Sequence, residues 1–484
     1  MSQDNTPKTI PEGILELLES SIASMMKESK IPGMSLAVLS GEDLLYAKGF
    51  GARNLEMNVP ATPNTLYGFG SCTKSYTALA IMQLYEQGKL DLYDPVNKYF
   101  NFKLGNKKNP ITIHHLLTHS SGIPNLGTAE ILLGRNAGYK EFHIPLSSWD
   151  DYLTFINDAK QEVAAEPGQR FAYSNESYTM LGAIIEKVSN MKYENYVREH
   201  ILNPLKMKRS CFLRDEFEKD SDIMTAYFPK FENGNIIQIE PASHPFDKYI
   251  FAPGGLLSSV IEQINYIEMN INQGIFEGTR IINGNLIQKM HTNYIETDMI
   301  RDAIGEFEKV GYGYGWIIIE DFFEHTTIFH VGGTNVSTSF IGFIPEKKFG
   351  IACACNSGGG YSLISAIPLL TMVFLLGKNP LKDIKFIEIE QKLTMLQGFY
   401  ETYKGINKLS VIKRGAMLYI EPLEESAPFN NGMSAPLIPE SLDEFKFYFL
   451  SGLGGRTSVE FEVGSAGKID LYIERNRFHK IKDL

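Results

Sequence analysis

The tetrapeptide Ser71-Cys72-Thr73-Lys74 places a hydroxyl and an amine at a spacing at which they could do chemistry together. A serine needs a base to become a nucleophile, and a lysine three residues later lies about one helical turn away on the same face. Such a lysine can accept a proton only if burial lowers its pKa. The same Ser-x-x-Lys spacing also begins at Ser24, Ser189, Ser410 and Ser465. The tetrapeptide alone therefore predicts little.

The surroundings of Ser71 distinguish it from the other four serines. Gly68-Phe69-Gly70 precedes it and predicts a tight turn, and a long apolar helical pattern follows it. At the start of that helix the backbone N–H of Ser71 would be free, and the positive end of the helix dipole would point at it. This N–H could donate to an oxyanion while the hydroxyl attacks a carbonyl. We interpret Ser71 as a nucleophile with Lys74 as its base, against the alternative of a capping serine and an exposed lysine.

A second pattern is Tyr173-Ser174-Asn175, which follows the loop signal Pro167-Gly168. Tyr-x-Asn can aim a phenol and an amide into one cleft, and a phenol beside a lysine ammonium is expected to have a lowered pKa and to shuttle a proton. Tyr-x-Asn also occurs at Tyr99 and Tyr193. Without the Ser71 motif, a packed tyrosine followed by a turn asparagine would be the better interpretation.

A third pattern is His330-Val331-Gly332-Gly333 at the end of a predicted strand, the one His-x-Gly among the ten histidines. Small residues there would let a substrate backbone lie close, and the N–H of Gly333 could be a second oxyanion donor. We place His330 with the catalytic candidates, and Gly332 and Gly333 with the substrate-binding ones. A structural histidine at a strand end is the open alternative.

Other catalytic motifs are missing from the sequence. It contains no Gly-x-Ser-x-Gly elbow, Walker loop or His-Glu-x-x-His metal site. No metal and no organic cofactor is indicated.

The elements that must position these residues fall into two regions. Strand-like segments at 34–48 and 314–354 flank a mostly helical stretch, which predicts one antiparallel sheet made from both ends of an α+β domain. From about residue 390, short alternating segments separated by turn signals predict a small all-β sandwich or barrel. We therefore expect one domain over residues 1–380 and a second over 390–484.

Composition excludes several classes of protein. The chain has 484 residues, 43% of them hydrophobic, so it can bury a sizeable core, and its net charge of −11 argues against a nucleic-acid partner. The longest apolar run, Leu363 to Leu376, is shorter than the ~20 residues of a membrane span. The polar N-terminus lacks the layout of a secretory signal, and the four cysteines do not suggest a disulfide framework. These features favour a cytoplasmic protein without a membrane partner.

Taken in order, the three motifs resemble those of the serine β-lactamase and penicillin-binding-protein superfamily, in its class C-like branch of peptidases and esterases. Supporting phrases lie at 31–34, 88–95, 116–124 and 254–256, so the resemblance covers about 30–375. It implies a five-stranded antiparallel sheet flanked by helices, and an acyl-enzyme mechanism. It also implies that Lys74 and Tyr173 share general-base and general-acid work, that Asn175 contacts the substrate amide, and that the N–H groups of Ser71 and Gly333 form the oxyanion hole. We take His119, within one supporting phrase, as structural.

One position departs from the superfamily pattern. The third motif is usually Lys-Thr-Gly, whose lysine helps hold a substrate carboxylate, whereas this chain has His330, which is largely neutral at pH 7. That change disfavours penicillin hydrolysis and carboxypeptidase action, since both handle a terminal carboxylate. A His-x-Gly triplet at this place is similar to D-aminopeptidases and to some esterases of the branch.

The C-terminal region carries a further resemblance. Gly398-Phe399-Tyr400, residues 437–440 and Phe447-Tyr448 are similar to the small lipocalin-like barrel appended to peptidase-like members of the branch, one of which assembles into a closed oligomer. A homo-oligomer is therefore an expectation. We expect a serine hydrolase that acts through an acyl-enzyme on a small-molecule or short-peptide substrate, as a peptidase or aminopeptidase, with D-residues left open. The alternatives are a carboxylesterase, a β-lactamase or penicillin-binding protein, and a non-catalytic binding scaffold.

Overall fold

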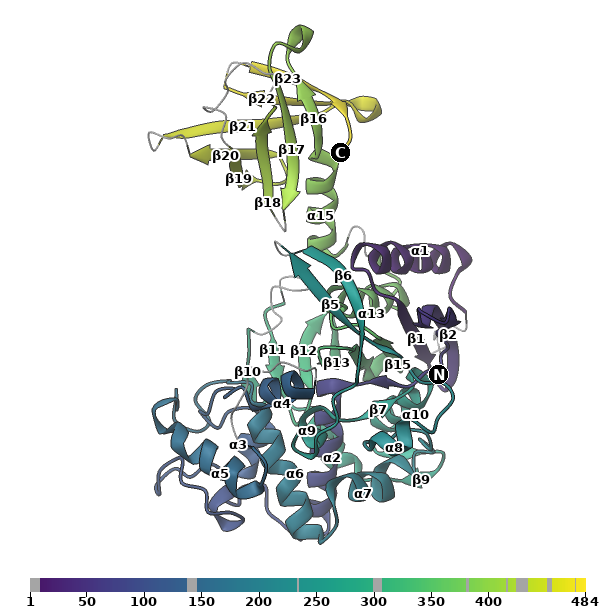
Figure 1. Ribbon diagram of the computed structural model, residues 1–484, viewed down its shortest axis with the longest axis vertical. Helices are drawn as coiled ribbons and strands as arrows, with labels where there is room; N and C mark the ends of the chain where they lie inside the picture. Colours follow the sequence, from purple (N-terminus) through teal and green to yellow (C-terminus); the bar gives the residue numbers. More distant parts are fainter. Residues whose placement is uncertain are drawn as a thin grey trace. The chain divides into compact units, whose positions relative to one another are not determined.

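The computed structural model describes residues 9–136, 146–232, 235–298, 307–379, 383–414, 417–423, 434–450, 455–474 and 476–484. The chain divides into two compact units, Met1–Lys378 and Asn379–Leu484 (Figure 1). The division into two domains, 1–380 and 390–484, stays a prediction. Among the described residues, no helix combines the length and the hydropathy needed to cross a membrane.

The first unit is built around a nine-stranded sheet in the order β10-β11-β12-β13-β14-β15-β1-β2-β3. Strand β1 pairs antiparallel with β15, with Met34 opposite Cys355, so segments from both ends of the unit meet in one sheet as the sequence predicts. The sheet is wider than the five strands implied by the resemblance, partly because short strands extend its edges. The strands are β1 (Gly33–Ser40), β2 (Asp43–Asn54), β3 (Val59–Pro60), β10 (Ile295–Glu296), β11 (Val310–Tyr312), β12 (Ile317–Phe322), β13 (His325–Gly333), β14 (Thr338–Ile344) and β15 (Phe349–Cys355).

Helices pack on the sheet because successive side chains of its strands point to opposite faces and are buried on both. Helix α10 (Val260–Ile271) lies against β1, β14 and β15, where Leu39, Ile341 and Ala352 join the main hydrophobic core. Strand residues between these, such as the buried Val38, point to the opposite side. Helix α13 (Tyr361–Leu375) also packs against β14 and β15, and α1 (Glu12–Glu28) packs against α13.

The helical region between the two sets of strands is organised around α2 (Thr73–Glu86). Every residue of α2 from Thr73 to Leu84 is buried, so this helix has no solvent-exposed face and lies inside the unit. It packs against α6 and α9. The other elements of the region are α3 (Ile113–Leu117), α4 (Thr128–Asn136), α5 (Trp149–Asp158), α6 (Asn175–Ser189), α7 (Tyr193–Val197), α8 (Arg214–Phe217), α9 (Lys248–Gly254), α11 (Gly284–Met290) and the hairpin of β5 (Ala226–Glu232) and β6 (Asn235–Ala242).

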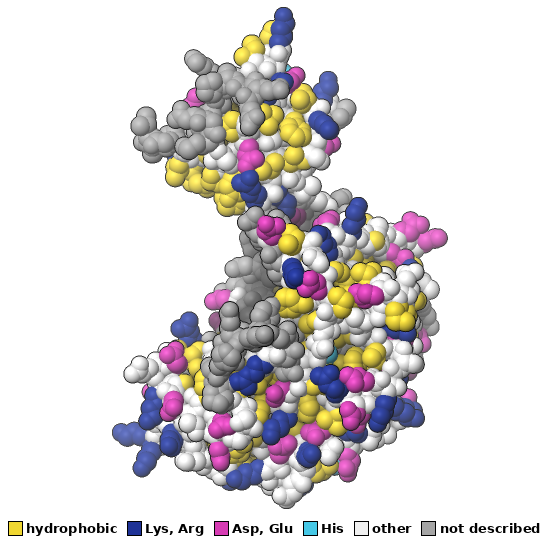
Figure 2. Space-filling view, in the orientation of Figure 1, with side chains coloured by type: hydrophobic (Ala, Val, Ile, Leu, Met, Phe, Trp, Pro, Cys, Tyr) yellow, Lys and Arg dark blue, Asp and Glu magenta, His cyan; other side chains and the backbone are white. Residues whose placement is uncertain are grey.

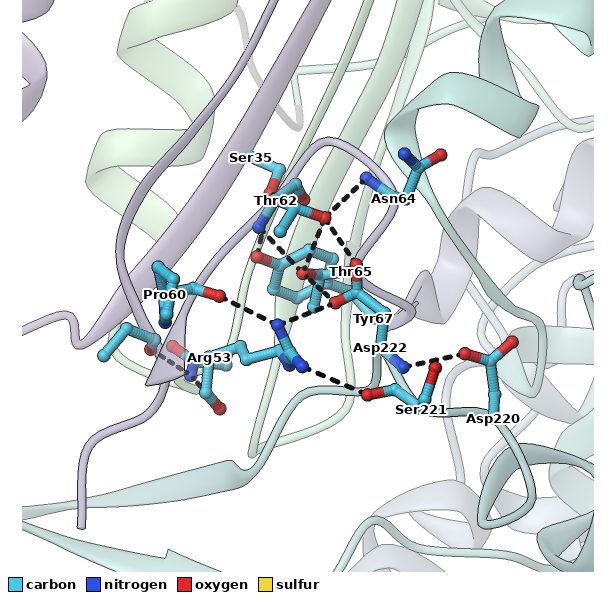
Figure 3. A network of polar contacts seen from close by, with 12 residues as sticks. Ser35, Arg53, Pro60, Thr62, Asn64, Thr65, Tyr67, Asp220, Ser221 and Asp222 are labelled. Carbon is cyan, nitrogen blue, oxygen red and sulfur yellow. Dashed lines mark hydrogen bonds and ion pairs between the residues drawn. The ribbon is translucent and has the colours of Figure 1, made fainter. Parts of the chain in front are cut away.

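A polar network holds the segment that leads into α2 (Figure 3). The Asp222 carboxylate accepts hydrogen bonds from Thr62 Oγ1 at 2.5 Å and Thr65 Oγ1 at 2.6 Å, and it pairs with Arg53 at 3.3 Å. The Tyr67 hydroxyl lies 2.9 Å from Ser35 Oγ on β1. Because these contacts satisfy buried polar groups on both sides of the segment, they fix the turn immediately before Ser71.

The second unit is a closed barrel of eight antiparallel strands, β16 to β23 in sequence order, closed by the pairing of β16 with β23. Alternate apolar residues, such as Val411, Ile420 and Leu471, fill its interior. The strands are β16 (Gly398–Glu401), β17 (Lys408–Arg414), β18 (Met417–Pro422), β19 (Ala435–Ser441), β20 (Lys446–Leu450), β21 (Arg456–Val463), β22 (Ile469–Ile473) and β23 (Asn476–Lys482). The small C-terminal β-barrel is therefore confirmed.

The predicted all-β region is wrong at its beginning. Helix α15 (Lys385–Leu396) occupies the residues before β16. Leu393 and Leu396, three positions apart on this helix, are buried in the same core as the barrel interior. The sequence pattern does not predict this helix, because strand signals dominate the region that follows it.

Candidate active site

The backbone before Ser71 takes a conformation that requires glycine. Gly70 has φ +48°, and a Cβ built on it would lie 2.3 Å from the backbone nitrogen of Gly333. Ser71 follows in a short 3₁₀ turn, Gly70–Cys72, that leads directly into α2. Its N–H therefore belongs to the first turn, where backbone N–H groups have no acceptor within the helix.

Lys74 is completely buried beside Ser71. Its Nζ lies 3.1 Å from Ser71 Oγ, 2.8 Å from Asn175 Oδ1 and 2.8 Å from the carbonyl oxygen of Pro253. Three acceptors match the three N–H groups of an ammonium. In the neutral amine, two N–H groups can stay on Asn175 and Pro253 while the lone pair faces the Ser71 hydroxyl.

Burial gives Lys74 the proton affinity of a base that works near neutral pH. Loss of solvation lowers its pKa from an ordinary value of 10.5 to about 7, although the negative charges of Glu130 and Glu176 act in the opposite direction. Burial of Lys74 is the condition under which it could accept a proton, and Lys74 is buried.

The phenol of Tyr173 lies over the same group of side chains. Lys74 Nζ is 4.7 Å from the centre of the Tyr173 ring, and the hydroxyl is within hydrogen-bonding reach of Ser71. The expected lowering of its pKa is wrong. Burial of the hydroxyl raises the pKa of Tyr173 well above its ordinary value, and only Ser71 acts against this rise. Although part of the Tyr173 side chain is exposed, the phenol stays protonated at neutral pH.

Asn175 is presented by the start of α6, and a buried histidine supports that start. Ser174 caps α6 by accepting a hydrogen bond from Ser177 N at 3.3 Å, and the Ser174 N–H donates to His119 Nδ1 at 3.1 Å. The His119 ring packs against Tyr173 with 4.4 Å between ring centres. His119 has φ +55°, a left-handed conformation that is unusual for residues other than glycine. Its Nε2 is buried and has no hydrogen-bond partner among the residues that the structure describes.

The carboxylate of Glu176 ties the start of α6 to the start of α4. Glu176 is fully buried and accepts from Thr128 Oγ1 at 2.7 Å, from Thr128 N at 3.0 Å and from Ser174 Oγ at 3.0 Å. These bonds fix α4 and Asn175 relative to one another.

His330 is buried near this cluster and uses both ring nitrogens. Its Nδ1 donates to the carbonyl oxygen of Val331 at 2.7 Å, so its Nε2 accepts from the Tyr312 hydroxyl at 3.0 Å. Burial, reinforced by the charge of Lys74, lowers the pKa of His330 to about 3. The imidazole is therefore neutral at pH 7. A catalytic role for His330 stays a prediction.

Gly332 and Gly333 bring the end of β13 against the turn that carries Ser71. Thr334 N donates to Ser337 O, so these two residues form a hydrogen-bonded pair of the antiparallel ladder. Hydrogen-bonded and non-hydrogen-bonded pairs alternate, so the next pair, Gly333 with Thr338, is not hydrogen-bonded and the Gly333 N–H points away from β14. On its other side, β12 pairs with β13 no further than Phe329. The Gly333 nitrogen thus lies on the unpaired side of β13, beside Gly70, the residue before Ser71. A Cβ on Gly332 would lie 1.9 Å from the carbonyl oxygen of Phe69, so this close approach requires glycine.

The structure brings all seven predicted site residues together at the junction of α2, α6 and the end of β13. It adds Pro253, Tyr312 and His119, which sequence reasoning left out or treated as structural. Pro253 directly precedes the Gly254-Gly255-Leu256 phrase, so a signal for it was present. Tyr312 and His119 become visible only when the fold places them beside the motifs. Among the described residues, no cluster of three or more His, Cys, Asp or Glu side chains could hold a metal ion.

This arrangement can perform nucleophilic catalysis. A hydroxyl contacts an amine whose pKa is near neutrality, and a protonated phenol lies beside both.

Comparison with known proteins agrees with this arrangement. Residues 18–366 match the family described as Beta-lactamase, and residues 380–479 match the Pab87 octamerisation domain. The octameric penicillin-binding protein homologue from Pyrococcus abyssi is 41% identical, with a TM-score of 0.83 over 96% of this chain and 100% of that one. A D-stereospecific amidohydrolase from Streptomyces sp. shares the fold at 22% identity, with a TM-score of 0.58 over 72% of this chain and 97% of its own.

The curated relatives are more distant. Protein flp of Staphylococcus aureus (strain MW2) is 27% identical over 350 residues, which are 71% of this chain. The chain spans 63% of the length of that relative. The family match extends over most of the chain and includes all three motifs. The chain therefore belongs to the β-lactamase family, a family of hydrolases that includes penicillin-binding protein homologues.

Proposed function

We propose that this chain is a serine hydrolase that cleaves small amides, foremost short peptides, through an acyl-enzyme on Ser71. The observation that carries the proposal is the buried Lys74, whose amine lies 3.1 Å from Ser71 Oγ and whose pKa is about 7. A lysine with this pKa is substantially neutral at physiological pH and can accept the serine proton, which a solvated lysine cannot do.

In the acylation step, Ser71 Oγ attacks the substrate carbonyl and its proton passes to the neutral Nζ of Lys74. The N–H groups of Ser71 and Gly333 hold the resulting oxyanion. When the C–N bond breaks, the leaving nitrogen takes the hydroxyl proton of Tyr173, and Tyr173 regains a proton from the Lys74 ammonium. The raised pKa of Tyr173 fits this role, because a protonated phenol can donate whereas a phenolate cannot.

In the deacylation step, a water molecule attacks the ester carbonyl and gives its proton to the neutral Lys74. The ester bond breaks, Ser71 Oγ takes a proton from the Lys74 ammonium, which becomes neutral again, and the acid leaves. Asn175 holds Lys74 in place and is exposed enough to contact the substrate amide. We assign His330 to shaping the end of β13, since both of its ring nitrogens bind neighbouring groups.

The same machinery would cleave esters, so a carboxylesterase is the nearest alternative. An amide substrate is favoured because a proton donor beside the leaving group matters for amines, which are poor leaving groups when unprotonated, and the name of the Streptomyces relative points the same way. A β-lactamase or penicillin-binding protein is less favoured because His330 is neutral and offers no cation to a carboxylate. The structure gives no reason to prefer D- or L-residues, and a cytoplasmic location stays an expectation.

We also infer that the chain forms a homo-oligomer through its C-terminal barrel. The matched octamerisation domain and the octameric relative support this. Figure 2 shows hydrophobic side chains on the visible face of the barrel, and Tyr403, Ile406, Leu450 and Ile481 are each more than half exposed. Light scattering coupled to gel filtration should give a mass several times 54.4 kDa. A monomer at all concentrations would contradict the inference.

The test of the main proposal uses D- and L-alanyl p-nitroanilides, a matched p-nitrophenyl ester and a serine-reactive fluorophosphonate. Ser71→Ala should lower kcat by about 10³- to 10⁶-fold and abolish labelling. Ser24→Ala is the matched control, because Ser24 begins another Ser-x-x-Lys on α1 and is exposed. Activity of Ser71→Ala within tenfold of the unmodified protein would overturn the proposal, and absence of labelling in the unmodified protein would favour a binding scaffold.

A further inference from the structure

A tyrosine from outside the three motifs lies across the end of β13. Tyr361 is the first residue of α13, and its hydroxyl would be 1.8 Å from a Cβ built on Gly333. The Tyr361 side chain is 51% exposed, so it borders solvent on one side and the Gly333 backbone on the other. Because Gly333 N–H is a proposed oxyanion donor, Tyr361 lies next to the position of the substrate acyl group.

An exposed carboxylate belongs to the same end of the site. Glu130 is on the first turn of α4, whose start is fixed by the bonds of Thr128 to the buried Glu176, next to Asn175. Asn125 Nδ2 donates to Glu130 Oε1 at 2.8 Å and holds the side chain in place. Glu130 is two residues after Thr128, and Thr128 donates to Glu176, the residue that follows Asn175. The first turn of α4, which carries Glu130, therefore lies beside the start of α6, and the charge of Glu130 raises the pKa of Lys74.

The balance of charge decides what kind of substrate this end can accept. Glu176, the other carboxylate that acts on Lys74, is buried and binds Thr128 and Ser174. His330 is neutral. Glu130 therefore leaves a negative charge, exposed to solvent, beside the acyl position. A charge of this kind attracts an ammonium and repels a carboxylate.

We propose that Glu130 and Tyr361 form the closed, acyl-side end of the cleft, where the Glu130 carboxylate binds the free α-ammonium of the substrate's N-terminal residue and Tyr361 prevents the acyl part from extending beyond that residue. The inference rests on the proposed function and makes it more specific: the chain removes single residues from the amino end of short peptides. The leaving peptide extends from the opposite side of the scissile bond.

The experiment compares two acyl groups that differ by one ammonium. Alanyl p-nitroanilide carries it, and propionyl p-nitroanilide has a hydrogen in its place. Glu130→Gln should lower kcat/KM for the alanyl substrate at least about tenfold and change that for the propionyl substrate less than about threefold. Any effect of Glu130 on the Lys74 pKa acts on both substrates and cancels in their ratio. Glu162→Gln, at another exposed glutamate, is the matched control and should change neither.

Tyr361 is tested with a longer acyl group. Tyr361→Ala should raise kcat/KM for glycyl-alanyl p-nitroanilide relative to alanyl p-nitroanilide by at least about tenfold, whereas Tyr361→Phe, which keeps the ring, should not. An unchanged ratio in Tyr361→Ala, or an equal loss on both acyl groups in Glu130→Gln, would overturn the inference. If Ser71 still labels with fluorophosphonate, only the inference fails. If nothing labels and nothing turns over, the proposed function itself fails.

Discussion

Helix α1 and the segment that leads into α2 contain the same residue types at the same spacing, Ser24 with Lys27 and Ser71 with Lys74, but in opposite surroundings. On α1 both side chains are exposed, and Ser24 Oγ donates to Glu28 at 3.0 Å. On α2 the lysine is fully buried and its amine binds Ser71, Asn175 and Pro253. Ser24 is a hydrogen-bond donor on a solvated surface, whereas Ser71 contacts a buried amine.

The difference shows that burial, and not the Ser-x-x-Lys spacing, lowers the pKa of the lysine. Helical geometry brings each lysine within reach of its serine. What separates the two pairs is that α2 has no solvated face, so Lys74 loses hydration and its pKa falls to about 7. Substitutions that treat the two lysines alike should therefore have unequal effects.

The largest expected effect comes from replacing each lysine by methionine. Lys74→Met removes the base and should lower kcat on alanyl p-nitroanilide by about 10³- to 10⁴-fold, while Lys27→Met should leave it unchanged. Steady-state rates measured on both variants, with circular dichroism to confirm folding, test this. Comparable activity of a folded Lys74→Met variant would mean that another group takes the serine proton.

The next effect separates the roles of Lys74 and Tyr173. Because Tyr173 is proposed to protonate the leaving nitrogen, Tyr173→Phe should slow the anilide by about 10²-fold. It should slow a p-nitrophenyl ester less than about tenfold, since nitrophenolate leaves without a proton. Lys74→Met should slow both substrates to a similar extent. If Tyr173→Phe affects ester and anilide equally, the phenol acts in the attack and not in the departure.

The unfolding free energy should depend on pH because Lys74 is buried in the folded protein. The folded-state pKa of about 7 lies below the ordinary value of 10.5, so between these two pH values the unfolded chain binds more protons than the folded one. Stability conferred by residue 74 therefore rises with pH across this window, by up to about 1.4 kcal/mol per pH unit.

Urea denaturation of the unmodified protein and of Lys74→Met would measure this contribution. The difference in unfolding free energy should move in favour of the unmodified protein by about 2 kcal/mol from pH 7 to pH 9. The same comparison with Lys27→Met should give no such trend. A flat difference for Lys74→Met would mean that the amine is hydrated in the folded protein.

Much of this organisation could be predicted from the sequence. The strand-like segments predicted at 34–48 and 314–354 match the outer limits of β1 and of β12 to β15 closely, because strands buried in a sheet carry strong local patterns. Strand β2 is predicted only in part, since it continues to Asn54. Helix α15 was missed, since its contacts with the barrel core are tertiary. The three motifs identified the side chains that the fold brings together.

Electrostatics and non-local support could not be predicted in the same way. The pKa of Tyr173 shifts upward and not downward as expected. Burial of the phenol raises it, and the nearby Lys74 amine is itself substantially neutral. Glu130 and Tyr361 lie far from the motifs in sequence, and only the packing of α4 and α13 gives them a place at the site.

His119, which was expected to be structural, offers the smallest and most selective test. Its Nδ1 accepts the Ser174 N–H, and its ring packs on Tyr173. His119→Phe keeps an aromatic ring but removes the acceptor, so the start of α6 should lose its anchor. We expect kcat to fall about tenfold with little change in KM, because the loss is of positioning and not of binding.

Asparagine provides the matched rescue at this position. Its side-chain oxygen can replace Nδ1 as the acceptor, and it tolerates the left-handed conformation that His119 adopts at φ +55°. His119→Asn should therefore retain kcat within about threefold. If the asparagine variant is as slow as the phenylalanine variant, the ring itself positions Tyr173, and the hydrogen bond to Ser174 is secondary. If both are fully active, Lys74 and the α6 cap hold Asn175 without help from His119.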